Sequence, residues 1–525
     1  MQTIQLRVTP VEASSEENIT KVTSRKLSLT SSDIDRVIVR KRSVDARQRQ
    51  IYVNLTVDVY LKGEQYTEDT FDDIIYQDVS GAKSIIIVGA GPAGLFAALR
   101  ALELGVKPIV VERGKDVISR RRDVADIAKT GIVLPESNYG YGEGGAGAFS
   151  DGKLYTRSKK RGSVDKVLRT FCKHGAQTSI LIDAHPHIGT DRLPMVIKKM
   201  RETILSHGGE VYFNTRMDSL ILEKQEVRGI RTSDGLELIG PVILATGHSA
   251  RDVYRYLHVA GILLESKSIA VGVRLEHPQQ IIDAIRYHNP KGRGEYLPAA
   301  EYVYKTQVMD RGVYSFCMCP GGFVVPASTA PNETVVNGMS PANRGSKWAN
   351  SGMVVEIRPE DIKALGFKVE DPRSPMNLLY WCEDFERKSY HAANCSLHAP
   401  AQRMTDFVNR KQSANLPSSS YPLDLTSSNL YDWMPALITE SLAQGFKAFD
   451  KVTKGFLTNE AQLIGVESRT SSPVRIPREP MLYNHITIKG LYPAGEGAGY
   501  AGGIVSAAID GQNCMEAAAA WVSAS

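Results

Sequence analysis

The sequence predicts an α/β fold in three parts: a parallel α/β domain assembled from two distant segments, an inserted α+β domain, and a small N-terminal α+β module. Two observations support the parallel domain. From Ser84, an apolar strand, a glycine turn and a helix with apolar residues at helical spacing follow one another, and a second apolar strand, Lys107 to Glu112, comes next. Residues 486–525 repeat this style with a strand, a glycine turn and an Ala-rich helix. One domain is therefore expected to use both ends of the chain.

Composition indicates an ordinary globular protein. The 525 residues suffice for roughly two to four domains, and 42% hydrophobic with 23% charged residues argue against disorder and fibrous architectures. We expect a cytoplasmic protein without membrane contact, because no apolar run of about 18 residues occurs and the first residues lack the pattern of a secretion signal. The six scattered cysteines predict reduced thiols. No zinc or EF-hand spacing occurs, so no metal is expected.

The N-terminal module is predicted at residues 1–80, where short β-type runs alternate with polar stretches and an acidic segment follows. The first part of the parallel domain spans residues 81–264, beginning with the strand-helix-strand unit at 84–112. Beyond it we expect a helix from Leu193 to His207, a β-meander and a return strand. The meander strands are Glu210 to Phe213, Met217 to Lys224, Glu226 to Thr232 and Leu236 to Ile239, and the return strand is Pro241 to Ala245.

Residues 265–480 are assigned to the inserted domain. Pro and Gly clusters interrupt isolated strands there, and the clearest helical stretch runs from Asp432 to Asp450. We expect this domain to cover a substrate. The parallel domain resumes over residues 481–525, with a strand from Ile486 to Tyr492 and a helix from Ile504 to Trp521.

The first functional motif is the glycine turn at residues 89–94 (GAGPAG), directly after a strand and directly before a helix. Gly89 permits the tight turn, Gly91 lets the backbone approach a pyrophosphate, and Gly94 allows helix and strand to pack closely. The free N–H groups of the helix N-terminus attract the same anion. The context therefore predicts dinucleotide binding rather than a turn that binds nothing. The predicted contacts are Gly89, Gly91, Pro92, Ala93 and Gly94.

An acidic residue stands where such a motif needs one. Glu112 ends the second strand, 18 residues after Gly94. Its carboxylate can accept hydrogen bonds from ribose hydroxyls and would repel a 2′-phosphate, which favours FAD or NAD over NADP. Arg113, the next residue, is counted among the cofactor-binding residues.

Two further glycine turns end apolar strands. Residues 242–247 (VILATG) follow the meander, and residues 490–496 (GLYPAGE) precede a glycine-rich run and the last helix. Each could be a structural turn alone, but in this order with the first motif both predict contact with the same dinucleotide. The residues expected there are Ala245, Thr246, Gly247, Gly495, Glu496, Gly503 and Ile504.

These three segments in this order resemble the glutathione-reductase-type FAD fold, in which one discontinuous Rossmann-like domain wraps FAD and an insertion covers the flavin. The resemblance spans roughly residues 84–261 and 480–525. It implies FAD as the cofactor, with Glu496 bonding the hydroxyls of its ribityl stretch. It also implies that the helix from Gly503 and Ile504 aims its dipole at the pyrimidine edge of the flavin, where negative charge develops on reduction.

A narrower resemblance covers most of the chain, to the bacterial proteins described as uncharacterised FAD-dependent, or NAD(FAD)-utilising, dehydrogenases. It implies the N-terminal module, the FAD domain and the cap, but no substrate. Because only one strand-GxGxxG-helix unit occurs, we expect no dedicated nicotinamide domain, and NAD(P)H at most as a transient donor. The matching segments are GEGGAGAFSDGKLYTR (142–157), ATGHSARD (245–252), GVRLEHPQ (272–279), CMCPGG (317–322), NGMS (337–340), ESRTSSPVRI (467–476) and PAGEGAGYAGGIVSAAIDG (493–511).

No catalytic residue is assigned, but several candidates exist. Within residues 142–153, Ser150 and Lys153 could donate hydrogen bonds to the flavin or to an anionic substrate, unless this is an unrelated loop. Cys317 and Cys319 could form a redox dithiol, although a single intervening residue strains a disulfide ring and favours two structural thiols. Three further candidates could hold a carboxylate or move a proton: His248, Arg251 and Arg274. Ordinary ion pairs are the simpler interpretation of these residues.

The sequence thus predicts an FAD-dependent oxidoreductase that passes a hydride between flavin N5 and a small-molecule substrate or electron acceptor beneath the cap. One alternative is an RNA-modifying flavoprotein, which a contiguous basic face around Arg120 to Arg122 and Lys159 to Arg161 would support. Without such a face, no nucleic acid partner is expected. The other alternative is a non-catalytic flavin redox sensor whose N-terminal module contacts a partner.

Overall fold

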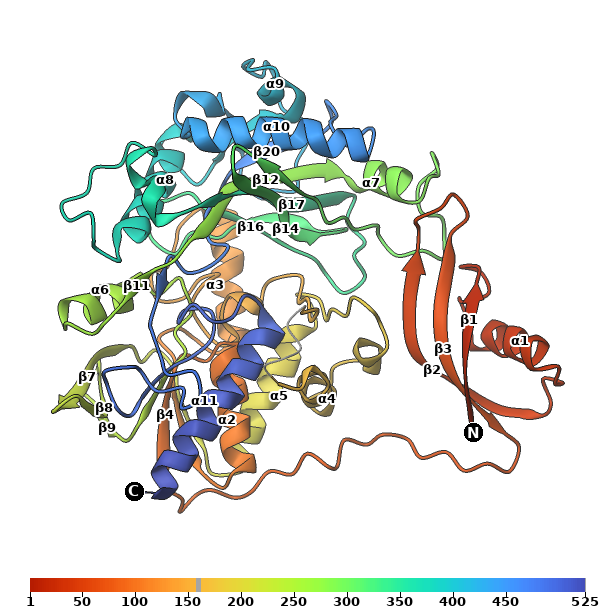
Figure 1. Ribbon diagram of the computed structural model, residues 1–525, viewed down its shortest axis with the longest axis horizontal. Helices are drawn as coiled ribbons and strands as arrows, with labels where there is room; N and C mark the ends of the chain where they lie inside the picture. Colours follow the sequence, from red (N-terminus) through yellow and green to blue (C-terminus); the bar gives the residue numbers. More distant parts are fainter. Residues whose placement is uncertain (157–161, 525) are drawn as a thin grey trace.

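The computed structural model describes residues 1–156 and 162–524, and it confirms an α/β fold with a parallel sheet (Figure 1). The sheet has five strands in the order β22-β10-β4-β5-β6. They are β4 (Ser84–Val88), β5 (Lys107–Val111), β6 (Glu210–Tyr212), β10 (Val242–Leu244) and β22 (Leu491–Pro493). Because β22 pairs with β10 at one edge, a single sheet joins both ends of the chain.

Alternate residues of the central strand, β4, face opposite layers, as the two-residue period of a strand requires. Ile85 and Ile87 belong to the apolar cluster of the helical layer, whereas Ile86 and Val88 belong to that of the antiparallel meander and α6. The helical layer includes α2 (Pro92–Glu103), α5 (Leu193–Ser206) and α11 (Ile504–Ala524). The other layer contains β7 (Met217–Glu223), β8 (Glu226–Thr232), β9 (Glu237–Ile239) and α6 (Arg251–Val259).

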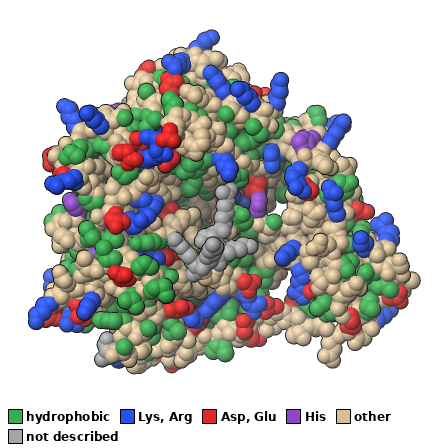
Figure 2. Space-filling model, in the orientation of Figure 1, with side chains coloured by type: hydrophobic (Ala, Val, Ile, Leu, Met, Phe, Trp, Pro, Cys, Tyr) green, Lys and Arg blue, Asp and Glu red, His purple; other side chains and the backbone are tan. Residues whose placement is uncertain are grey.

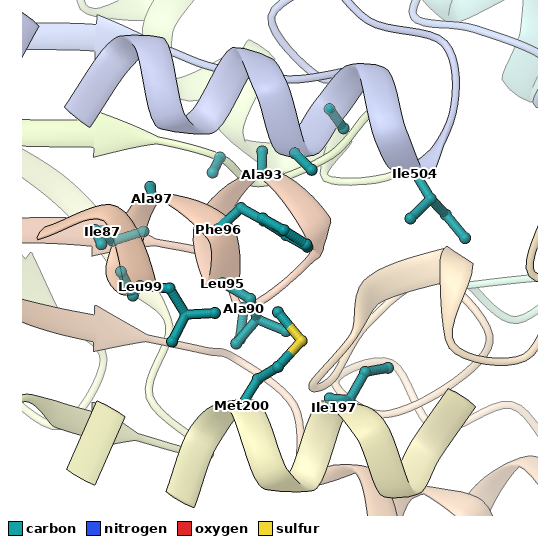
Figure 3. Close-up of a cluster of buried hydrophobic side chains, with 14 of the residues drawn as sticks. Ile87, Ala90, Ala93, Leu95, Phe96, Ala97, Leu99, Ile197, Met200 and Ile504 are labelled. Atoms are coloured by element: carbon teal, nitrogen blue, oxygen red, sulfur yellow. The ribbon is translucent and has the colours of Figure 1, made fainter. Parts of the chain in front are cut away.

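Helix α2 lies between α11 and α5, and their side chains interdigitate in one apolar cluster (Figure 3). Phe96 of α2, Met200 of α5 and Ile504 of α11 all belong to it. The contact between α2 and α11 requires glycine at position 511, because a Cβ there would lie 2.0 Å from the carbonyl oxygen of Ala93. The first turn of α2 therefore packs directly against α11 around Gly511.

The inserted part, called the cap from here on, is built on a seven-stranded sheet with the order β13-β14-β17-β12-β20-β18-β19. The central strands β12 and β17 pair antiparallel over their whole length. The strands are β12 (Ile269–Pro278), β13 (Lys305–Val308), β14 (Arg311–Cys319), β17 (Trp348–Ile357), β18 (Ala399–Arg403), β19 (Leu425–Ser427) and β20 (Gln462–Glu467), with a separate hairpin of β15 (Phe323–Pro326) and β16 (Val336–Met339).

The two faces of the cap sheet differ in polarity. Val271, Val273 and Leu275 of β12 pack with α8 and α10 in an apolar core on the outer face (Figure 1). The intervening positions of β12 include the buried polar residues Arg274 and Glu276. A sheet that is polar on its inner face is suited to line a site. The cap helices are α7 (Gln279–Arg286), α8 (Asn377–Ala392), α9 (Met404–Val408) and α10 (Ala436–Val452).

The chain passes between the parallel domain and the cap twice, and two short paired strands hold these two connections side by side. Strand β11 (Glu265–Ser266) pairs antiparallel with β21 (Val474–Arg475), near the predicted boundaries at 265 and 480. Val474 and Ile476 pack into the layer of α6. The cap is therefore attached through two adjacent connections.

The N-terminal module folds around its own small core. Its strands β1 (Gln2–Val8), β2 (Ile34–Asp45) and β3 (Tyr52–Leu61) have the order β1-β3-β2, with α1 (Glu16–Leu27) against them. The edge strand β2 contacts the parallel domain at Arg42, whose backbone exchanges hydrogen bonds with Ile182 and Ala184 and whose side chain pairs with Asp183 at 2.7 Å. A long extended segment then leads to β4 (Figure 1).

Several sequence predictions need correction. The segment Glu210 to Phe213 was predicted as part of the meander, but β6 is the edge strand of the parallel sheet. Strand β22 begins at Leu491 rather than Ile486, and α10 begins at Ala436, after Pro435, rather than at Asp432. Several helices were missed, among them α3 (Val117–Thr130), α4 (Val164–Lys173), α6 and the long cap helix α8.

Candidate functional site

One cavity of about 360 Å³ lies where the carboxyl ends of the parallel strands meet the cap. This is the edge of an open parallel sheet at which ligands usually bind. Of the predicted cofactor-binding residues, all but Gly94 line it: Gly89, Gly91, Pro92, Ala93, Glu112, Arg113, Ser150, Lys153, Ala245, Thr246, Gly247, Gly495, Glu496, Gly503 and Ile504. The structure therefore brings three distant glycine turns around one space.

The first glycine turn has the geometry that its sequence predicts. Gly89 has a φ of +105°, and a Cβ on Gly94 would lie 1.9 Å from the carbonyl oxygen of Gly89, so Gly94 serves close packing of helix and strand. At Gly91 a Cβ would meet, among the described residues, just the Cα of Gly145, 3.9 Å away. The first turn of α2 has no side-chain cap. Open space and unpaired N–H groups at a helix N-terminus fit a pyrophosphate.

Glu112 holds the surroundings of this turn together. It is 5% exposed, and its carboxylate accepts hydrogen bonds from the backbone N–H groups of Ala90, Gly114 and Gly142, each at 2.9 Å. A carboxylate offers about four acceptor positions, so one remains for a ribose hydroxyl. Glu112 therefore has a positioning role that the sequence did not reveal, and its contact with a ribose stays a prediction.

Arg113 lines the cavity, but its guanidinium is committed to protein partners. It pairs with Glu136 at 2.7 Å and Asp252 at 2.9 Å, and it lies over the ring of Tyr141. These ion pairs outweigh burial and raise its pKa above the ordinary value. Its contribution to the site is therefore to order the cavity wall.

The glycine-rich loop at residues 138–147 is held by a buried cation. Arg120 of α3 is fully buried and points its guanidinium at the loop, where burial lowers its pKa to about 10. The group stays charged near neutral pH and donates to five backbone carbonyls, those of Asn138, Tyr139, Gly142, Glu143 and Gly145. Arg120 therefore cannot belong to the basic face that the RNA-modifying alternative needs. Arg121 and Arg122 are exposed, and Lys159 to Arg161 lie outside the described residues.

Replacing Arg120 by lysine should loosen this loop and weaken FAD binding about tenfold. Lysine has three donors in place of five and lacks the planar fork, so buried carbonyls lose partners at a cost of about 1–3 kcal/mol each. Limited proteolysis across residues 138–147 and a flavin binding titration measure both effects. Arg121→Lys, one residue along α3 and exposed, is the matched control and should behave as wild type. Equal behaviour of the two variants would contradict the role given to Arg120.

The third glycine turn is fixed by a buried ion pair. Asp510 of α11 accepts a hydrogen bond from the N–H of Gly495 at 2.7 Å and pairs with Arg478 at 2.5 Å. Glu496, next in the turn, keeps 27% of its side chain exposed and lies 3.7 Å from His248. At Gly503, which precedes α11, a Cβ would meet no atom of the described residues within 4 Å. The turn thus places open space, a partly exposed carboxylate and a helix N-terminus in the same wall.

The cap closes the cavity with Phe316, Cys317, Asn337 and Arg469. Lys153 reaches across to it and donates a hydrogen bond to the carbonyl of Met318. Ser150 donates to the carbonyl of Gly147 at 2.8 Å. Both residues predicted from the loop at 142–153 therefore lie at the cavity, but in this structure they bind protein groups.

A buried charge cluster joins the cap to the parallel domain. Glu386 of α8, which has no exposed side-chain surface, accepts hydrogen bonds from Arg251 of α6 at 2.7 and 2.8 Å and from Arg469 at 3.0 Å. Arg469 also pairs with Glu333 at 3.1 Å. Burial and the charge of Glu386 raise the pKa of Glu333 to about 7. Arg251 thus makes the ordinary ion pairs that the sequence analysis favoured.

Several cavity residues were missed from the sequence. Thr215, Arg216 and Met217 lie at the start of the meander, and Asn337 and Arg469 lie in the cap. The last two stand in segments quoted above only for the family resemblance, NGMS and ESRTSSPVRI. No local spacing distinguishes them, because only the fold brings them to the cavity. Across residues 1–156 and 162–524 no helix is long and apolar enough to cross a membrane, and no cluster of potential metal ligands occurs.

Comparison with known proteins gives matches to two family models. Residues 268–470 match the family described as FAD-dependent protein, C-terminal domain-like, and residues 1–60 match a domain of unknown function (DUF8436). The first match corresponds to the cap. Its description confirms the predicted cofactor, FAD.

Solved structures show resemblance at low identity. A geranylgeranyl bacteriochlorophyll reductase-like protein from Thermoplasma acidophilum has a TM-score of 0.36 at 12% identity, over 85% of this chain and 80% of its own. An oxidoreductase from Methanosarcina mazei has a TM-score of 0.33 at 12% identity, over 82% of this chain and 100% of its own. These values imply nothing about substrate.

A curated relative aligns with nearly the whole chain. An uncharacterised protein from Clostridium beijerinckii (strain ATCC 51743 / NCIMB 8052) is 38% identical over 532 aligned residues, which span 97% of this chain and 98% of the relative. The chain therefore belongs to the same family as this clostridial protein, and the match over its cap marks it as an FAD-dependent protein.

Proposed function

We propose that the protein is an FAD-dependent oxidoreductase in which a hydride passes between N5 of the flavin and a small-molecule substrate bound beneath the cap. The observation that supports this most is the single cavity formed by three glycine turns of the parallel domain and four residues of the cap. When bound, FAD supplies two-electron chemistry that amino-acid side chains lack. The protein would supply binding, orientation and a closed space.

The two helix N-termini and two carboxylates would hold the cofactor. The N-terminus of α2 and Gly91 fit the pyrophosphate, while Glu112 and Glu496 fit its hydroxyl groups. The N-terminus of α11 stands in the same wall and favours negative charge nearby. The parallel sheet, the meander layer and the inserted cap together support placing the fold in the glutathione-reductase type.

The cap would bind the substrate and exclude water. Phe316 gives the cavity an apolar surface, and Asn337 gives it an amide. Among the described residues, the side chain of Lys153 donates to the carbonyl of Met318, and its ammonium group carries three N–H donors, so it can also attract an anionic group. A substrate carrying a carboxylate or a similar anion fits this wall best.

The first experiment is to purify the protein, record its visible spectrum, and mix it anaerobically with NADH and separately with NADPH. We expect bound FAD, and bleaching of the flavin band if a nicotinamide nucleotide is the donor. A bound flavin that neither nucleotide reduces would assign the donor role to the substrate or a protein partner. Absence of flavin even after FAD is added would refute the proposal.

An RNA-modifying activity gains no support from the described residues. Arg120 is buried, and the face in Figure 2 carries acidic and basic side chains interspersed, without one contiguous basic patch. Backbone binding of nucleic acid needs such a patch. We therefore keep a small-molecule substrate as the proposal.

A further inference from the structure

We propose that Cys317 and Cys319 are a redox-active dithiol that exchanges two electrons with the flavin. The inference rests on the proposed function and adds a second redox centre to the same cavity. Cys317 lines the cavity that the cofactor-binding turns surround, whereas Cys319 is fully buried directly behind it. A pair of structural thiols would place both sulfurs in a core.

The backbone presents Cys317 to the cavity. The pairing of β14 with β17 is interrupted between Phe316 and Cys319, and Cys317 has a φ of +45°, a left-handed conformation that side chains other than glycine rarely adopt. Such departures from the ladder re-aim a side chain. Cys317 therefore leaves the sheet and Cys319 remains in it.

The charges around the pair favour a thiolate at Cys317. A hydrogen bond from Cys319 and the positive charges of Lys153 and Arg274 hold the pKa of Cys317 well below its usual range, against the opposing effects of burial and Asp151. The hydrogen bond and burial raise the pKa of Cys319. An accessible thiolate beside a buried thiol is the arrangement of a nucleophile and its partner.

Arg274 ties the two cysteines together. It is fully buried, and its Nη2 donates to the carbonyl oxygen of Cys317 at 2.7 Å and to Sγ of Cys319 at 3.3 Å. Its Nη1 pairs with the carboxylate of Glu467 at 2.9 Å. Burial raises the pKa of Glu467 to about 7. A guanidinium within reach of a sulfur stabilises the thiolate formed whenever an S–S bond at this site is broken.

Lys153 places the pair next to the loop that the sequence predicts at the flavin. Its ammonium group donates to the carbonyl of Met318, the residue between the two cysteines. The contact joins the loop at 142–153 to the Cys317–Cys319 segment inside the cavity wall. Electron transfer between cofactor and dithiol then needs no large movement of the chain.

The proposed step balances as follows. Reduced FAD gives up two electrons and two protons and returns to oxidised FAD, while the S–S bond between Cys317 and Cys319 breaks and each sulfur takes one electron and one proton. The reverse reaction oxidises the dithiol. A disulfide ring closed across one intervening residue is strained. This disulfide should therefore be a stronger oxidant than an unstrained one, and the dithiol should be the resting form.

Reductive titration of the holoprotein tests the proposal. Protein treated with the thiol oxidant diamide, freed of reagent and titrated anaerobically with dithionite should take up about four electrons per flavin, and untreated protein about two. Cys317→Ser and Cys319→Ser should each take up about two after the same treatment. Cys395→Ser removes an exposed thiol outside the cavity and should still take up about four.

A second measurement needs neither a variant nor the flavin. After diamide, alkylation and digestion of the apoprotein, the peptide with Cys317 and Cys319 should carry no alkyl group unless it is first reduced. Two alkylated cysteines in that peptide, together with about two electrons per flavin in treated wild type, would overturn the dithiol while leaving the proposed function intact. Failure to bind FAD would refute the proposed function. Alkylation would still show whether Cys317 and Cys319 form a disulfide.

Discussion

Replacing Gly91 by aspartate should abolish FAD retention while the protein remains folded. The Cβ of the new side chain would lie 3.9 Å from its nearest neighbour, and the φ of −77° suits any residue, so the backbone is not strained. Aspartate is also among the best residues at a helix N-cap, which is the position of Gly91. Its carboxylate would, however, point into the space expected for the pyrophosphate and repel it.

The expected loss is about 1,000-fold in FAD affinity, or about 4 kcal/mol. Flavin content after purification and the quenching of FAD fluorescence on titration measure it, and thermal unfolding of the apoprotein checks the fold. Gly81→Asp, at an exposed glycine with open space around it and outside the cavity, is the control and should retain the cofactor. If Gly91→Asp binds FAD as wild type does, the first glycine turn is not the pyrophosphate site.

Replacing Glu386 by alanine should destabilise the protein by about 3–5 kcal/mol, because it leaves the guanidinium groups of Arg251 and Arg469 buried without their shared carboxylate. Arg251 belongs to the parallel domain and Glu386 to the cap, so the variant should also loosen the attachment of the cap. Denaturant unfolding followed by tryptophan fluorescence and by flavin release separates the two effects. Glu17→Gln, which breaks an exposed pair with Lys21, should leave both curves unchanged. Equal curves for Glu386→Ala and wild type would contradict the role of the cluster.

The same cluster predicts a direction of pH dependence. Burial alone would raise the pKa of Glu386, but the two arginines outweigh it and hold the folded-state pKa well below the ordinary value. The unfolded state then binds the proton more tightly, so the contribution of Glu386 is complete above the unfolded-state pKa and is lost as pH falls toward the folded-state pKa. Wild type should therefore lose stability on acidification more steeply than Glu386→Ala, a difference that unfolding curves between roughly pH 6 and pH 3 would show.

The limits of the sequence analysis have identifiable physical causes. Helix α3 was missed because two of its buried positions, Arg120 and Asp123, are charged. Their partners lie outside the helix, in the loop at 134–145 and at Lys115. Strand β6 was placed in the meander because three residues at a sheet edge show no alternation of their own. In both segments tertiary contacts stabilise an element whose local pattern is ambiguous.

The sequence by itself determined the fold class of the parallel domain, its discontinuity and its cofactor. These follow from local patterns, because glycines at fixed spacing between a strand and a helix have few other physical uses. Only the tertiary structure decided which residues of the cap face the cavity. That choice depends on the pairing of β12, β14 and β17 and on the interruption at Phe316, and a change of one residue in register turns every side chain of a strand to the opposite face. Asn337 in β16 and Arg469 just after β20 are recognisable as site residues only in the folded chain, and only the fold places Cys317, a candidate from its sequence, at the cavity.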